Sequence, residues 1–278
     1  MISVALACYN GENFIYEQIQ SIINQTITDL EIIICDDKST DNTIDIIHNI
    51  KDKRIKLYQN NIQLGVVKNF EKAISLCNGE YIALSDQDDV WVEKKLEKQL
   101  NQYIIEREKR PSGPLLLYHD LILVDKELEV LKDSFWKLYK ISNFSLAKNL
   151  FDNHFTGCTT FFDKITSEYY LPFISTDILH DHSMSILTNC FGKNIEMNEK
   201  LIKFRRHQNN STNTNKENNL LKKLSNSNKY EKEIKFAKKF YHENKQKLNE
   251  TQQKTFEKFI RLENKNKFYI MLIKKLTF

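Results

Sequence analysis

Residues 30–50, "LEIIICDDKSTDNTIDIIHNI", contain the pattern that decides the fold of this chain. The apolar, mostly β-branched run at its start is typical of a buried strand, and the apolar positions after Asp41 recur at helical spacing. The same pairing recurs as "SVALACYN" with "NFIYEQIQSIINQ", "RIKLYQN" with "VVKNFEKAISLC", and "YIALSDQDD" with "VEKKLEKQLNQYIIERE". Four such units predict an α/β fold with a mostly parallel, Rossmann-like sheet and helices on both faces.

Polar side chains follow each of the four predicted strands. In sheets of this kind the ligand binds outside the carboxyl ends of the strands, so these side chains are candidate ligand contacts. Two acidic clusters end adjacent strands, and we expect their charges to converge on one crevice. The candidates in chain order are Tyr9, Asn10 and Glu12, then Asp36 and Asp37, then Gln63 and Lys68, then Asp86, Asp88 and Asp89.

The three aspartates within residues 86–89 indicate a bound cation. Carboxylates this close repel one another unless positive charge lies between them. The stretch Asn10-Gly11-Glu12 is neither a dinucleotide fingerprint nor a phosphate-binding loop, so a bound phosphate would need another device. Mg²⁺ and Mn²⁺ are typically held by one or two carboxylates together with substrate phosphate oxygens. The sequence therefore predicts a divalent cation that bridges the aspartates to a phosphate.

Local structure offers a simpler explanation for the same acidic residues. Asp89 could cap a helix that starts near Val90, and Asp36 and Asp37, followed by residues 39–41, could form a loop and a helix N-cap. Convergence of both clusters on one crevice favours the binding site.

Length and composition indicate a globular protein. A chain of 278 residues that is 41% hydrophobic can bury one large core, or a core and a smaller appendage. Its five cysteines are odd in number and widely spaced, which indicates neither a disulfide framework nor a zinc site. The chain starts without a basic signal region and has no run of eighteen apolar residues. We therefore expect a cytoplasmic protein.

The net charge of +4 is divided unevenly along the chain. Residues 216–278 contain 17 Lys and Arg against 7 Glu and no Gly or Pro, with apolar residues at helical spacing. We predict a globular domain over residues 1–215 and a basic helical extension over 216–278. The extension could pack on the body or on another copy of the chain, which would give a homo-oligomer.

A third expectation for the extension is peripheral attachment to the anionic inner face of a membrane. It rests on the terminal stretch "KFYIMLIKKLTF", in which apolar residues alternate with lysines. Those residues are Phe268, Ile270, Met271, Leu272, Ile273 and Leu276, beside Lys267, Lys274 and Lys275.

Several of these segments together resemble the bacterial family 2 glycosyltransferases, which are inverting enzymes with the A-type nucleotide-sugar-binding fold. The resemblance runs in order through "SVALACYNGENFIYEQIQSIINQT", "LEIIICDDKSTDNT", "NNIQLGVVKNFEKAI" and "GEYIALSDQDDVW". It continues more weakly through "FTGCTTFF", "ILHDHSMSIL" and "LIKFRRHQNNST", which are similar to acceptor-side segments of surface-polysaccharide enzymes, rhamnosyltransferases included. It implies a donor-binding part over residues 1–110 and an acceptor part over 111–215.

The resemblance also implies a role for individual residues. Asp181 occupies the place of the catalytic base, Asp88 binds a Mn²⁺ or Mg²⁺ ion that carries the diphosphate, and Asp86 contacts the ribose and sugar of the donor. The basic segment Arg205, Arg206 and His207 lies near the diphosphate, with His207 counted among the metal ligands. The resemblance places Tyr9, Asn10, Glu12 and Lys68 around the nucleotide of a UDP- or dTDP-linked sugar. It implies that Asp37, or its neighbour Asp36, bonds the base of that nucleotide.

The chemistry of glycosyl transfer agrees with these roles. Displacing a nucleoside diphosphate requires stabilisation of the charge on the leaving phosphate, and the attacking hydroxyl of a glycan or lipid-linked glycan must lose a proton to a base. One displacement inverts the anomeric carbon and needs no second nucleophilic carboxylate. Taken singly, Asp181 could instead favour the first turn of a helix, and the residues at 205–207 could be solvated surface charges.

Two other functions remain open from the sequence. A sugar-nucleotide nucleotidyltransferase also binds a nucleotide at such a sheet, but it normally has a glycine- and arginine-rich loop where this chain has Ala7-Cys8-Tyr9-Asn10. A non-catalytic nucleotide- or nucleic-acid-binding module could use the basic extension. Glutamates interrupt the aromatic and basic residues of "YEKEIKFAKKFYHENK", and we expect no nucleic-acid partner.

Overall fold

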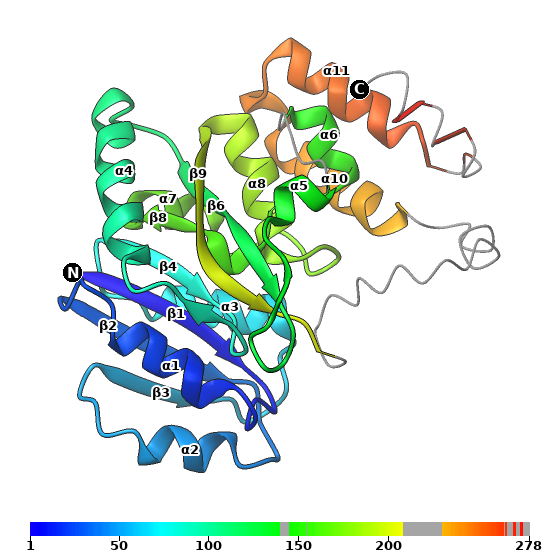
Figure 1. Ribbon diagram of the computed structural model, residues 1–278. Coiled ribbons are helices and arrows are strands. Elements are labelled where there is room, and N and C mark those ends of the chain that lie inside the picture. The colour runs from blue at the N-terminus through cyan, green and yellow to red at the C-terminus, as the bar shows by residue number, and fades with distance from the viewer. Residues whose placement is uncertain are drawn as a thin grey trace.

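A computed structural model of the chain describes residues 1–139, 145–153, 155–207, 230–263, 265, 269–270 and 273–274 (Figure 1). Its described strands form one nine-stranded sheet. The strands are β1 (Ile2–Cys8), β2 (Leu30–Asp36), β3 (Ile55–Gln59), β4 (Tyr81–Ser85), β5 (Val90–Trp91), β6 (Leu115–Val124), β7 (Val130–Lys132), β8 (Phe161–Asp163) and β9 (Lys193–Arg205). Their order is β3-β2-β1-β4-β8-β6-β9-β5, with β7 paired to β6.

Helices connect and cover these strands. The α-helices of the first half are α1 (Ile15–Ile23), α2 (Thr43–Asn49), α3 (Val66–Ser75) and α4 (Lys95–Lys109). Those that follow are α5 (Phe135–Tyr139), α6 (Leu146–Phe151), α7 (Lys164–Tyr170), α8 (His180–Phe191), α10 (Glu231–Asn244) and α11 (Glu250–Ile260), with short 3₁₀ turns η1 (Gly157–Thr159) and η2 (Lys245–Lys247).

The first four strands are parallel, which confirms the predicted fold class. Every residue of β2 is buried, which explains why its apolar run does not alternate with polar residues. The chain steps outward from β1 to β2 to β3 and then returns to β4 beside β1. Because such crossovers are right-handed, α3 lies on the opposite face of the sheet from α1 and α2.

The register of the parallel strands brings their polar ends together. Cys8 at the end of β1 pairs with Asp36 at the end of β2, and Leu6 pairs with Ser85 at the end of β4. The loops after β1, β2 and β4 therefore leave the sheet at one edge, where the acidic clusters were expected to meet.

The second half of the sheet begins with antiparallel strands. β8 runs antiparallel to both β4 and β6, and β9 runs parallel to β6. The two-residue strand β5 pairs with β9, so the chain does not enter a helix directly after Asp89. The alternative in which Asp89 caps a helix near Val90 is therefore wrong, because α4 begins only at Lys95 and Asp89 is fully buried.

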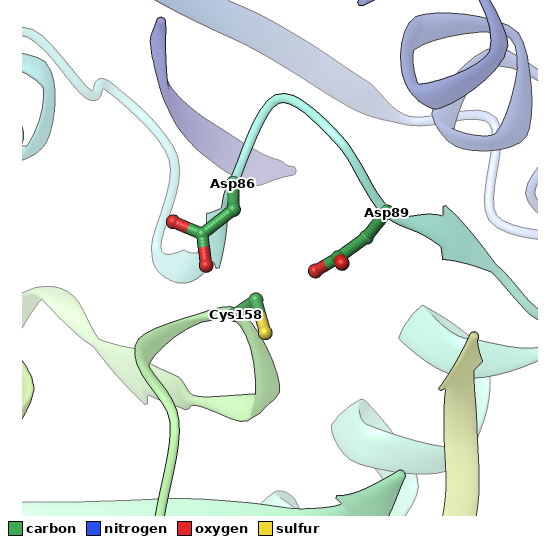
Figure 2. A group of neighbouring side chains, drawn as sticks. All are labelled: Asp86, Asp89 and Cys158. Atoms are coloured by element: carbon green, nitrogen blue, oxygen red, sulfur yellow. The ribbon is translucent and has the colours of Figure 1, made fainter. Parts of the chain in front are cut away.

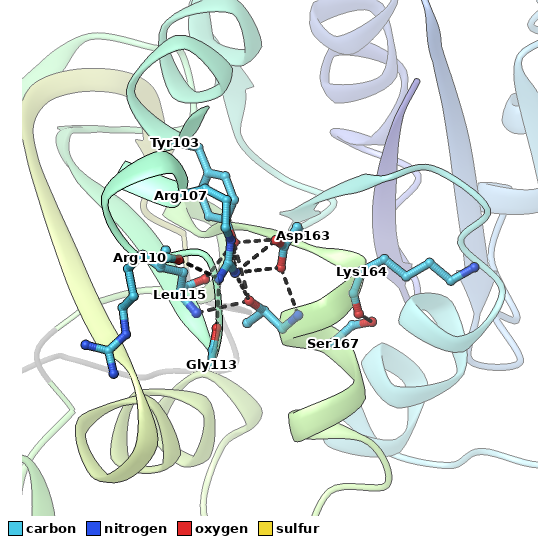
Figure 3. A network of polar contacts seen from close by, with 9 residues as sticks. Tyr103, Arg107, Arg110, Gly113, Leu115, Asp163, Lys164 and Ser167 are labelled. Atoms are coloured by element: carbon cyan, nitrogen blue, oxygen red, sulfur yellow. Dashed lines mark hydrogen bonds and ion pairs between the residues drawn. The ribbon is translucent and has the colours of Figure 1, made fainter. Parts of the chain in front are cut away.

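A polar network fastens the second half of the sheet to α4 (Figure 3). Arg107 on α4 donates to Asp163 Oδ1 at 3.0 Å, to Tyr103 Oη at 3.1 Å and to the Gly113 carbonyl at 2.9 Å. The Asp163 carboxylate also caps α7. This network fixes β8 beside β4, and it thereby fixes the turn η1, which precedes β8.

The C-terminal helices α10 and α11 lie beside α6 and α8, at the end of the molecule farthest from β3 and α2 (Figure 1). The predicted boundary at residue 215 falls within 208–229, outside the described residues. Phe268, Met271, Leu272, Leu276, Lys267 and Lys275 also lie outside them. Within the described part of the chain, no helix is long and apolar enough to cross a membrane.

Candidate active site

Asn10 and Glu12 join the loop after β1 to the loop after β2. The Asn10 backbone N–H donates to Ser39 Oγ at 2.9 Å, and the Glu12 N–H donates to Asp41 Oδ2 at 3.0 Å. Glu12 Oε2 in turn accepts the Asn42 side-chain amide at 2.7 Å. Asn10 and Glu12, the two predicted nucleotide contacts, thus hold the loops after β1 and β2 together through their own hydrogen bonds.

Tyr9 connects the loop after β1 to the loop after β4. Its N–H donates to Gln87 Oε1 at 2.8 Å, and Gln87 Nε2 donates back to the Tyr9 carbonyl at 3.0 Å. A side chain at Gly11 would place its Cβ 2.5 Å from Gln87 Oε1, so this contact requires a glycine there. The Tyr9 side chain itself is exposed, which leaves its ring open to contact with a ligand.

Asp36 and Asp37 are both buried and both bonded within the protein. Asp36 accepts the Ser39 N–H at 2.9 Å. Asp37 Oδ1 accepts Asn60 Nδ2 at 2.9 Å and the Leu64 N–H at 2.7 Å, while its Oδ2 accepts the Gly65 N–H at 2.8 Å. Asp37 therefore holds the loop that precedes α3, and its Oδ2 has the spare acceptor capacity for a nucleotide base.

Lys68 and Arg206 make their described contacts away from the acidic cluster. Lys68 on α3 pairs with Glu71 at 2.7 Å and faces a surface hollow that Leu171 also lines. Arg206 donates to Tyr139 Oη of α5 at 3.1 Å. Their predicted donor contacts stay predictions.

Three groups that could hold a metal converge below the loop after β4 (Figure 2). The ligand atoms of Asp86, Asp89 and Cys158 all lie within 4.8 Å of one another, and Cys158 reaches this place on η1. Burial, with help from the Asp88 and Asp181 carboxylates, raises the pKa of Asp86 to about 7. Burial and the neighbouring carboxylates also raise the pKa of Asp89 well above its usual value. The cluster is therefore short of positive charge.

A buried lysine lies beneath this cluster. Lys95, at the start of α4, is fully buried, and its Nζ bonds Gln99 Oε1 at 2.9 Å and lies 3.6 Å from the centre of the Trp91 ring. Burial lowers the pKa of Lys95 to about 7. Negative charge on the Cys158 thiol or the Asp89 carboxyl group acts in the opposite direction, because it favours the protonated lysine. Because Lys95 is only partly protonated near neutral pH, its positive charge offsets the negative charge of the Asp86 and Asp89 carboxylates only in part.

The structure brings Asp88 and His207 together from positions 119 residues apart. His207 Nε2 lies 2.8 Å from Asp88 Oδ2, and its ring packs 4.6 Å from the ring of Phe14. Arg205 is buried beside them, where its Nε donates to the Asp88 carbonyl at 3.0 Å and its Nη2 pairs with Glu17. Arg205 therefore braces the Asp88 backbone in this arrangement, and the predicted metal ligands Asp88 and His207 are neighbours.

Asp181 lies in the first turn of α8, buried near the same cluster. Its Oδ2 accepts the Gly157 N–H at 3.0 Å, and its Oδ1 accepts the His182 N–H at 2.8 Å; the nearby Asn153 side chain also favours a lower pKa of Asp181. Burial outweighs these donors and raises the pKa of Asp181 to about 6. Because Gly157 bonds Asp181 and the next residue, Cys158, belongs to the group formed with Asp86 and Asp89, the predicted base is close to the predicted donor site.

Gly157 packs against the start of α8. A Cβ at this position would lie 2.7 Å from His180 Nε2 and 3.6 Å from the Asp181 Cβ. The His180 ring cannot easily withdraw, because it is buried and stacks on the Phe70 ring at 4.1 Å.

We predict that Gly157→Ala displaces the first turn of α8 and lowers turnover while the protein stays folded. Displacement of a catalytic group by about 1 Å can cost on the order of 100-fold in rate. The measurement is kcat of the variant beside that of Gly79→Ala, where a Cβ would also lie 2.7 Å from its nearest neighbour, the Ser3 backbone nitrogen, before the start of β4. Equal effects of the two changes on kcat would contradict the prediction.

The donors in the crevice suit a divalent cation. Carboxylate oxygens are the ligands of Mg²⁺ and Mn²⁺, whereas imidazole and thiolate ligands favour softer transition metals. Asp88, next to His207, and Asp86 with Asp89 offer carboxylate oxygens that fit such a cation.

Comparison with known proteins gives the class of this fold. Residues 3–111 match the family model described as glycosyl transferase family 2. S. aureus TarS in complex with UDP-GlcNAc superposes with a TM-score of 0.60 at 19% identity, over 86% of this chain and 66% of that one. A Pyrobaculum calidifontis mannosyltransferase with GDP-Man and Mn²⁺ gives 0.55 at 17% identity, over 75% and 57%. The chain therefore has the A-type glycosyltransferase fold.

Two sequence relatives are also described as glycosyltransferases. An Escherichia coli UDP-Glc:alpha-D-GlcNAc-diphosphoundecaprenol beta-1,3-glucosyltransferase is 42% identical over 109 residues, which are 39% of this chain and 43% of the relative. A second E. coli enzyme with that description is 29% identical over 68% of this chain and 74% of the relative. The chain thus spans less than half of the first relative and about three quarters of the second. The predicted resemblance to family 2 is confirmed for residues 3–111.

Sequence reasoning missed four groups that the structure places in or beside the crevice. Cys158 and Lys95 gave no signal, because their position depends on how η1 and α4 pack beneath β4. Asn153 and Gly157 were also passed over, although Gly157 stands within the quoted segment "FTGCTTFF". A glycine among apolar residues can indicate close approach of another segment, and here that segment is α8.

Proposed function

We propose that this protein is a metal-dependent, inverting glycosyltransferase that moves a sugar from a nucleoside diphosphate to a hydroxyl of a glycan acceptor. The observation that carries the proposal is that residues 157 and 158 link two acidic groups from different halves of the chain: the Gly157 N–H bonds Asp181 at 3.0 Å, and the Cys158 thiol lies within 4.8 Å of a carboxylate oxygen of Asp86. One carboxylate can then contact the donor while the other faces the acceptor. The family 2 match over residues 3–111 and the shared fold support the class.

Asp181 is the proposed general base. With a pKa of about 6 it is mostly ionised at neutral pH, and it is basic enough to accept the proton of an acceptor hydroxyl. The N–H groups of Gly157 and His182 hold the carboxylate in place before the acceptor arrives. A single attack on the face opposite the leaving group inverts the anomeric carbon.

Asp88 and His207 are the proposed metal ligands, and Asp86 is the proposed contact to the ribose and sugar. A bound cation would offset the negative charge of the leaving diphosphate. Tyr9, Asn10, Glu12, Lys68, and Asp37 or Asp36 complete the proposed nucleotide site, with Arg205 and Arg206 near the diphosphate. Arg205 acts there through its contact with the Asp88 backbone.

We propose a UDP-linked hexose as donor and a lipid-linked glycan in surface-polysaccharide synthesis as acceptor. Both E. coli relatives are described as transferring from UDP-Glc to a GlcNAc-diphosphate lipid, and the S. aureus structure contains UDP-GlcNAc. A dTDP-linked sugar such as rhamnose is the alternative donor from the sequence resemblance. The purified protein is incubated with UDP- and dTDP-sugars, Mn²⁺ or Mg²⁺, and a GlcNAc-diphosphate lipid, and nucleoside diphosphate release is measured.

The expected result of this panel is metal-dependent release of UDP with one sugar, at a rate that rises when the acceptor is present. Pyrophosphate formation from a sugar phosphate and a nucleoside triphosphate would indicate a nucleotidyltransferase instead. Nucleotide binding with no turnover of any donor would indicate a non-catalytic module. Either outcome would overturn the proposal.

We further propose that the basic C-terminal extension attaches the protein peripherally to the inner face of the membrane. Exposed lysines of α10 and α11, such as Lys232, Lys239 and Lys254, support it, since each basic residue near an anionic surface adds about 1 kcal/mol of attraction. We expect the full chain to sediment with anionic vesicles at low salt and with neutral vesicles much less. Equal sedimentation with both, or none with either, would refute attachment; self-association in ultracentrifugation would point to an oligomer.

A further inference from the structure

Helix α6 connects the catalytic base to the C-terminal part of the chain. On one side it bonds α8: the carbonyl of Asn149 lies 2.5 Å from His182 Nε2, and the Asn149 side chain bonds Ser185. The backbone N–H of the same His182 donates to the carboxylate of Asp181 at 2.8 Å. The environment of the base therefore depends on where α6 lies.

The other side of α6 is covered by the C-terminal helices. The Phe151 ring meets the Phe259 ring of α11 edge to face at 4.8 Å and the Tyr230 ring at 5.3 Å. All three side chains are buried. Lys274 pairs with Asp152, the residue that ends α6, and its Nζ lies 3.4 Å from Tyr230 Oη.

The far end of α8 is held by the same helices. Gln252 Nε2 on α11 donates to the Cys190 carbonyl at 2.8 Å, and the Phe191 ring stacks on Phe240 of α10 at 6.2 Å. Phe240 in turn stacks on Phe256 of α11 at 5.2 Å. These contacts hold α8 at its last turn, at the opposite end of that helix from Asp181.

A helix as short as α6 depends on its neighbours. Six residues form less than two turns, and isolated helices below about 12 residues are marginal in water. The position of α6 must therefore come from packing, and Phe151 is its main buried contact with the C-terminal helices. Loosening that contact frees the segment that carries Asn149 and Asn153.

We propose that α10, α11 and Lys274, which follows them, are a positioning element for glycosyl transfer, in which Phe259 and Lys274 hold α6 so that Asn149 and His182 align Asp181. The inference rests on the proposed role of Asp181 as base. It gives the C-terminal extension a function in turnover that is separate from membrane attachment. Phe259, Phe151 and Lys274 act through α6 and do not contact substrate.

The test compares two equal changes on α11 in the full chain. Phe259→Leu removes the ring that faces Phe151, whereas Phe256→Leu removes an equally buried ring that faces Phe240 and Tyr241. We expect Phe259→Leu to lower kcat on the order of 10- to 100-fold through misalignment, with donor Kd unchanged. We expect Phe256→Leu to destabilise the protein to a similar degree and to leave kcat close to that of the unsubstituted protein.

Hydrogen exchange of residues 146–153 provides a readout that does not require transferase activity. We expect faster exchange there in Phe259→Leu and no change in Phe256→Leu. If neither phenylalanine variant folds, Lys274→Met and Lys238→Met replace them. Lys274 pairs with Asp152 at the end of α6, whereas Lys238, the control, pairs with Glu263. The inference would be overturned if kcat were the same in the test variant and in its control. It would also be overturned if hydrogen exchange of residues 146–153 were unchanged in the test variant. Failure of the proposed function alone would leave the exchange difference intact.

Discussion

Asp181→Asn is expected to lower kcat for glycosyl transfer by roughly 100- to 10,000-fold, the range that general bases contribute. Donor affinity should stay the same, because the base acts on the acceptor proton in the transition state. Asn keeps the size of Asp, and its single side-chain oxygen can still accept one of the two N–H groups, of Gly157 or of His182, that bond the two oxygens of Asp181, so most of the local structure of α8 should persist. The measurement pairs kcat with the donor Kd from calorimetry.

The pH profile and a matched variant sharpen this test. In the unsubstituted protein kcat should fall below pH 6, where a base with a pKa of about 6 becomes protonated, and Asp181→Asn should lose that dependence. Asp177→Asn makes the same chemical change just before α8, where Asp177 pairs with Lys235, and should leave kcat nearly unchanged. A loss below tenfold in Asp181→Asn would remove Asp181 from the mechanism.

Asp88→Asn is expected to abolish the dependence of donor binding on Mn²⁺. An amide oxygen is a much weaker ligand than a carboxylate, and stabilisation of a leaving phosphate by a metal is worth several kcal/mol, so transfer should fall on the order of 100-fold or more. The reason for choosing Asp88 is its contact with His207 at 2.8 Å. Calorimetry of donor binding with and without Mn²⁺ is the measurement.

Two further variants serve as controls for Asp88. His207→Gln should weaken the Mn²⁺ dependence in the same direction, since both side chains are proposed ligands of one ion. Asp133→Asn, which breaks an exposed ion pair with Lys200, should leave it unchanged. If Asp88→Asn kept the full Mn²⁺ dependence, the ion would have to bind elsewhere, and the group formed by Asp86, Asp89 and Cys158 would be the next candidate.

The sheet was predictable because its signals are local. The apolar run of β2 and the helical spacing after Asp41 are properties of neighbouring residues, and burial of β2 on both faces explains the uninterrupted run. Asp86 and Asp88 could be assigned to the crevice for the same reason, since they directly follow a strand. The brevity of β5 was not predictable, because two residues pair with β9 only after β9 has joined the sheet.

The contacts that complete the site are long-range, and the sequence does not specify them. His207 reaches Asp88 because β9 pairs with β5, and Cys158 reaches Asp86 and Asp89 because β8 pairs with β4. The contacts of Asn149 with His182 and Ser185 require α6 to lie against α8, which the sequence pattern of a six-residue helix cannot indicate. Asp181 and His207 were assigned through resemblance, and their roles are proposals that the variants above test.

The anomeric configuration of the product is the most direct test of the central claim. The purified full-length protein is supplied with an α-linked UDP-sugar, Mn²⁺ and a GlcNAc-diphosphate lipid, and the new linkage is determined by proton NMR. A single displacement assisted by Asp181 predicts a β linkage formed in equal amount with UDP. An α linkage, or a sugar product formed without release of UDP, would contradict it.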